Sequence, residues 1–130
     1  MPIFTVETTY RLPVFRQRSY KAKTIAAACR LAIEDDDRSH EKHDYESAGE
    51  TFITGVWQGR DVANRAPALP VPSHHRETLQ RRADHFEVLL GLVKVLSGDV
   101  KPSDRVFWRD RAQLVIDKAQ AILAGAKDPD

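Results

Sequence analysis

The strongest constraint on the fold of this chain is the apolar run VLLGLVKVL at residues 88–96. Residues 74–96 predict a helix that Ser73 can cap, because the apolar positions recur at helical spacing. One stripe of this helix comprises Leu79, Ala83, Phe86, Leu90 and Val93, and the apolar surface continues around it through Val88, Leu89, Leu92, Val95 and Leu96. A helix that is apolar on most sides needs more than one neighbour.

The segment after this helix predicts its first neighbour. Gly98 is typical of a helix C-cap, and Pro102 or Ser103 can open a second helix over residues 104–125. Its apolar stripe comprises Trp108, Ala112, Val115, Ala119 and Ile122, flanked by Phe107, Leu114 and Leu123. The short connection predicts an antiparallel helical hairpin.

A second copy of the chain is the partner that we expect for the remaining apolar surface. A twofold dimer would join two hairpins into a four-helix bundle. The alternative is a monomer whose hairpin folds back on its own sheet. The residues predicted to mediate self-association are Phe86, Leu89, Leu92, Val93, Leu96, Trp108 and Val115.

The N-terminal part predicts a β-β-α-β module with a small three-stranded sheet. Alternating residues in IFTVETTYRL indicate the first strand, VFRQRSYKA the second, and ETFITGVWQG the third. We expect a β-hairpin turning near residues 12–14 and a helix capped by Thr24 that ends in the Asp run at residues 35–37. A right-handed crossover then gives the sheet order 2-1-3, with one helix covering the sheet.

The fold class is therefore α+β, and we expect one compact domain. Its parts are the module at residues 1–62, a proline-bearing connector at 63–73 and the helical hairpin at 74–126. With 130 residues, 42% of them hydrophobic and 30% charged, the composition is that of an ordinary globular protein. No apolar run is long enough to span a membrane, and the N-terminus does not resemble a signal peptide, so a cytoplasmic location is expected.

The stretch DDDRSHEKHDYESAGE at residues 35–50 collects ligand-type side chains. His40, His43 and Asp44 are weak candidates for a zinc or manganese site. The spacing does not match a calcium loop, and a solvated connector with local caps is the favoured interpretation. We therefore predict neither a metal nor another cofactor.

Charge is segregated along the chain. Residues 1–33 hold six Lys or Arg against one acid, and residues 34–50 hold eight acids against two bases, so the two segments can face each other. The alternative is a nucleic-acid surface on the expected β-hairpin, where aromatic residues are interleaved with Arg11, Arg16, Arg18, Lys21 and Lys23.

No motif with a transferable catalytic mechanism occurs, neither a glycine-rich phosphate loop nor GxSxG, HExxH or CxxC. Cys29, the only cysteine, is interpreted as a small buried helix residue, and His74, His75 and His85 as surface residues. Trp57 and Trp108 are expected in the core or in the dimer interface. The leading hypothesis is a non-enzymatic protein that acts through protein–protein interaction. A nucleic-acid-binding regulator is the alternative, followed by a metal-dependent enzyme.

Overall fold

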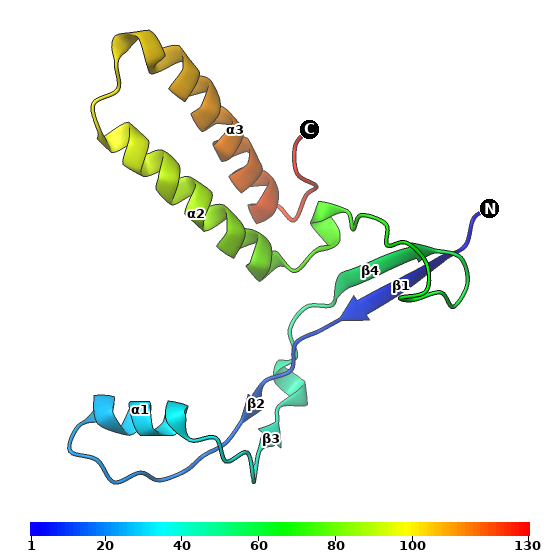
Figure 1. Cartoon of the computed structure of the whole chain (residues 1–130), viewed down its shortest axis with the longest axis vertical. Coiled ribbons are helices and arrows are strands. Elements are labelled where there is room, and N and C mark those ends of the chain that lie inside the picture. The colour runs from blue at the N-terminus through cyan, green and yellow to red at the C-terminus, as the bar shows by residue number, and fades with distance from the viewer. The chain divides into compact units, whose positions relative to one another are not determined.

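A computed structural model describes residues 1–130, and the chain is a mixed α+β protein, as predicted (Figure 1). Contacts divide it into two compact units. The first consists of Met1–Thr9 together with Thr51–Asp130, and the second of Tyr10–Glu50. Each unit is described separately.

The first unit contains a two-stranded antiparallel sheet. Strand β1 (Phe4–Thr9) pairs with β4 (Phe52–Gln58), with Val6 opposite Val56 and a register shift between Glu7 and Thr8. Phe4, Val6, Ile53 and Val56 line one groove of about 510 Å³ with the connector residues Leu69, Pro70 and Pro72 and with His75. The connector also pairs with β4, since Leu69 donates its backbone N–H to the Val56 carbonyl at 2.8 Å.

Strand β4 carries most of the buried apolar residues. Phe52 and Trp57 are buried, and the indole of Trp57 lies directly over Gly55. A Cβ atom on Gly55 would stand 2.3 Å from Cη2 of Trp57, so only glycine fits there. Trp57 was expected in the core or in the dimer interface, and it lies in the core.

The first unit also contains the C-terminal helical hairpin. After a 3₁₀ turn at Ser73–His75, α2 spans Thr78–Ser97 and ends at the C-cap Gly98. A second 3₁₀ turn at Pro102–Asp104 leads into α3 (Arg105–Leu123), which runs antiparallel beside α2 (Figure 1). Ser73 does not cap α2, because that helix begins five residues later and the Ser73 hydroxyl accepts a bond from the Asp128 N–H.

The second unit contains a short ribbon and one helix. Strand β2 (Val14–Phe15) pairs antiparallel with β3 (Lys42–His43), and a 3₁₀ turn follows at Tyr45–Ser47. Helix α1 spans Ile25–Glu34 and is capped by the Thr24 hydroxyl, which accepts a bond from the Ala27 N–H, as predicted. It ends at Glu34, and the first residue of the Asp run, Asp35, is its C-cap, where carboxylates oppose the helix dipole.

The predicted three-stranded sheet of order 2-1-3 is wrong, because the β-hairpin near residues 12–14 does not form. The chain does not turn back after β1. The Arg11 and Pro13 carbonyls instead accept hydrogen bonds from the backbone N–H groups of Gly49 and Asp44, respectively. A tight β-hairpin turn needs residues that adopt positive φ, and the sequence RLPV offers none. Two separate two-stranded sheets result, although the first strand does pair with the strand at 52–58.

Helix α1 does not provide the buried packing face that the sequence suggested. None of its residues is buried, and Cys29 is exposed, contrary to the prediction. The face at Ala28 and Ala32 is only half-buried. Polar contacts, described below, hold this helix to the preceding segment.

Candidate functional site

The contact between α2 and α3 is built around a buried histidine. His85 is 4% exposed, and its Nε2 lies 2.9 Å from the backbone carbonyl of Val115 in α3. Because a carbonyl only accepts, Nε2 must carry the proton, and the buried Nδ1 has no hydrogen-bond partner. The expectation that His85 lies on the surface is therefore wrong.

A second buried polar residue ties the C-terminal tail to the start of α2. Arg81 is 8% exposed and donates to the Ala126 carbonyl at 2.7 Å and to the Asp128 carboxylate at 2.8 Å. That hydrogen bond, first among the causes, lowers the pKa of Asp128. Arg81 was not among the predicted residues and His85 was expected on the surface, although Arg81, His85 and Leu92 recur at helical spacing on one face.

The outward face of α2 is apolar and uncovered. We call Leu79, Phe86, Leu90 and Val93 the outer stripe. Their exposed fractions are 69%, 64%, 43% and 59%. Steps of seven, four and three residues place them on one face of the helix. Neither helix packs extensively on the β1–β4 sheet, so the sheet does not cover this stripe.

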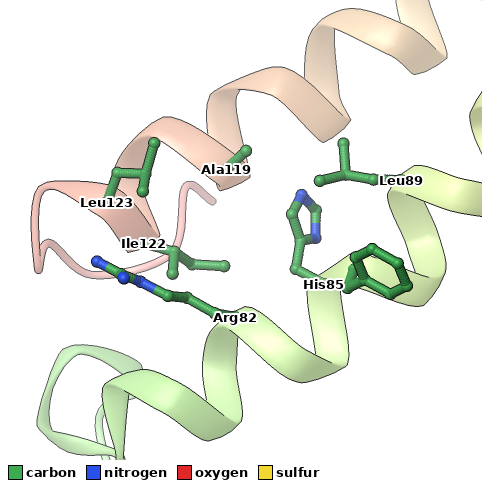
Figure 2. Close-up of a pocket in the computed structure, with 7 residues that line it drawn as sticks. Arg82, His85, Leu89, Ala119, Ile122 and Leu123 are labelled. Carbon is green, nitrogen blue, oxygen red and sulfur yellow. The ribbon is translucent and has the colours of Figure 1, made fainter.

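A groove between α2 and α3 adjoins the outer stripe. It encloses about 180 Å³ and is lined by Phe86 and Leu89 from α2 and by Ala119, Ile122 and Leu123 from α3, with His85 and Arg82 completing the wall. Figure 2 shows His85 and Ile122 reaching from opposite helices into the space between them. The groove is almost entirely apolar and therefore suits a hydrocarbon group.

The seven predicted self-association residues divide into two groups. Phe86, Val93 and Leu96 are exposed, whereas Leu89, Leu92, Trp108 and Val115 are half-buried. The Trp108 ring meets Phe107 edge-on at 5.1 Å. Only the first group is freely available to a partner, and self-association stays a prediction.

The predicted nucleic-acid residues do not line one strand surface. Arg16 caps the C-terminal end of α1 by donating to the carbonyls of Ala32, Asp35 and Asp37. Arg18 bonds the Asp35 carboxylate at 3.0 Å and the Ser39 carbonyl at 2.7 Å. Arg11 lies before the ribbon, and Lys21 and Lys23 are exposed in the loop before α1. Arg16 and Arg18 thus bind the acidic segment rather than a surface ligand.

The candidate metal ligands are not gathered into a site. No group of three or more His, Cys, Asp or Glu in residues 1–130 could hold a metal ion. His40 occupies a turn with φ of 63°, and His43 lies in β3 with its ring stacked on Tyr45 at 6.2 Å. Asp44 caps the 3₁₀ turn by accepting the Ser47 N–H at 3.2 Å.

Asp35 is the centre of the polar network in the second unit, and it supports a pH prediction. Its carboxylate accepts bonds from the Tyr20 hydroxyl at 2.7 Å, from the Asp37 N–H at 3.0 Å and from Arg18. These donors lower its pKa from 3.8 to about 2, with Tyr20 the largest cause. The same bond raises the pKa of Tyr20.

We expect the hydrogen bonds of Asp35, which hold the end of α1 to the preceding segment, to be intact above pH 3.8 and to weaken as the pH falls through about 2. Between these two values only the folded state keeps the Asp35 carboxylate charged. A carboxyl NMR titration should place the Asp35 midpoint near 2, and Tyr20→Phe should raise it. A midpoint unchanged by Tyr20→Phe would contradict the network.

Comparison of the chain with family models, curated proteins and solved structures finds no match in any of the three. None of the three helices has the length and hydrophobicity needed to cross a membrane.

Proposed function

We propose that this chain acts without catalysis of its own, through protein–protein interaction, and that it self-associates through the outer stripe of α2. A cytoplasmic location belongs to the same proposal. The observation that carries it is the exposure of the four apolar side chains of that stripe, which range from 43% to 69% exposed. Scattered exposed apolar residues are common, but a contiguous apolar stripe on a helix marks an interaction surface.

Magnitudes favour assembly over an isolated hairpin. Each outer-stripe side chain leaves on the order of 100 Å² of apolar surface in water, which is worth roughly 2 kcal/mol on burial. Two copies would bury eight such side chains, a gross gain of about 16 kcal/mol, which is at the upper end of the ~4–15 kcal/mol that association costs or above it. The groove next to the stripe adds further apolar contact.

Light scattering on the eluting protein tests the proposal. We expect a mass of twice the 14.7 kDa chain for the native sequence. Phe86→Asp should weaken association by about 30-fold or more and return the mass to that of one chain, because the interface would then bury an unpaired carboxylate.

The matched control is Gln120→Glu, which adds the same charge at an exposed position of α3 outside the stripe and the groove. It should leave the mass unchanged. A native chain that elutes at 14.7 kDa at every concentration, or a Phe86→Asp variant that keeps the double mass, would overturn the proposal.

A further inference from the structure

We infer that the partner of α2 is α2 of a second copy, antiparallel about a twofold axis beside Phe86, with each Phe86 seated in the groove of the other copy. This inference rests on the proposed self-association and specifies its geometry. Three observations support it, namely the symmetry of the outer stripe, the size of the groove and the available area.

The two ends of the outer stripe are symmetric about Phe86, whereas Leu90 has Arg82 at its mirror position. Leu79 lies seven residues before it and Val93 seven residues after it, and both are more than half exposed. Two antiparallel helices that cross at Phe86 therefore bring Leu79 of each copy opposite Val93 of the other. A twofold interface requires this self-complementarity.

The charges of α2 are compatible with the same register. Arg82, four residues before Phe86, comes opposite Leu90, four residues after it, and Asp84 comes opposite Val88. No two like charges meet across the axis, and the aliphatic part of Arg82 can lie along Leu90.

The groove has the size of one aromatic ring. Its volume of about 180 Å³ is close to the about 150 Å³ of an apolar cavity known to take up benzene. Ala119 keeps this space open, and Phe86 is the largest exposed side chain of the outer stripe. Phe86 also borders the groove of its own copy. A twofold axis between ring and groove therefore places each Phe86 ring in the groove of the other copy.

The area reaches the lower limit for a specific dimer. The outer stripe with Leu123 offers five exposed side chains, at roughly 100 Å² each, or on the order of 500 Å² per copy. Both copies together bury ~1,000 Å², which is the lower limit for a specific interface and typical of a weak dimer. The second copy is thus an occupant that the surface matches in both area and pattern.

Complementary variants test this geometry by native mass spectrometry. Phe86→Ala removes the ring and one side of the groove wall but leaves Leu89, Ala119 and Ile122 in place, and Ala119→Leu fills the groove but keeps the ring. Each variant alone should dimerise at least about tenfold more weakly than the native chain. Mixing them should restore a mixed dimer, since one ring still finds one groove.

The possible outcomes separate this inference from the proposed function. A native dimer that persists in both variants would overturn the Phe86 geometry while self-association stands. A monomeric native chain would overturn both. If Ala119→Leu fails to fold, Leu123→Trp replaces it, because this variant fills the groove from an exposed position. It is then mixed with Phe86→Ala in the same way. Absence of a mixed dimer in that mixture would contradict the inference.

Discussion

Replacement of Gly55 by alanine is expected to lower the free energy of unfolding by about 1–3 kcal/mol, because the new methyl group overpacks the strand. The Cβ atom would stand 2.3 Å from Cη2 and 2.8 Å from Cζ3 of Trp57. The indole of Trp57 is the group that this Cβ meets, so the substitution must displace the buried ring. Urea unfolding measures the loss, and Trp57 fluorescence in a Trp108→Phe background should shift to the red.

Gly91 provides the matched control for this substitution. It lies inside α2, and a Cβ there meets no atom within 4 Å. Gly91→Ala should raise the free energy of unfolding by about 0.5–1 kcal/mol, because alanine is the better helix former. Equal effects of the two substitutions would contradict the packing of Trp57 on Gly55.

Replacement of Arg81 by methionine is expected to destabilise the helical hairpin by about 1–3 kcal/mol, because it leaves the Asp128 carboxylate and the Ala126 carbonyl without their donor. The loss should stay below that of a fully buried ion pair, since the Asp128 side chain is 34% exposed and water can screen it. Thermal unfolding of the variant measures it, and the Asp128 pKa should rise.

Arg109 in α3 serves as control because it carries the same charge, is exposed and lies outside the groove. Arg109→Met should change the free energy of unfolding by no more than about 0.5 kcal/mol. A similar loss in both variants would show that net charge, and not the tie between α2 and the C-terminal tail, stabilises the hairpin.

Local patterns in the sequence predicted the helices and two of the three caps, and only the Ser73 cap of α2 was wrong. Thr24 and Gly98 occupy the caps expected for them, and the stripe from Trp108 to Ile122 is the face of α3 that is covered. These features depend on residues three to four apart, which is the range that helical periodicity describes.

Long-range pairing was predicted less well. The β-hairpin failed because the pairing of Arg11 and Pro13 with Gly49 and Asp44 joins residues more than thirty positions apart. The segregation of charge did indicate that the basic N-terminal segment and the acidic segment lie close together, since Arg18 forms ion pairs with Asp35 and Asp37. The burial of Arg81 and His85 depends on the Ala126, Asp128 and Val115 groups that face them, which no pattern along α2 reveals.

The central claim is that the outer stripe of α2 meets a second copy of the chain, with Phe86 of each copy in the groove of the other. It is tested most directly by isotope-filtered NOE spectroscopy on an equal mixture of ¹³C-labelled and unlabelled chains. The account predicts cross-peaks from aromatic protons of the unlabelled chain to the methyl groups of Ala119 and Leu123 in the labelled chain, all of them lost in Phe86→Leu. No intermolecular cross-peak to either methyl group, with the native chain at millimolar concentration, would contradict it.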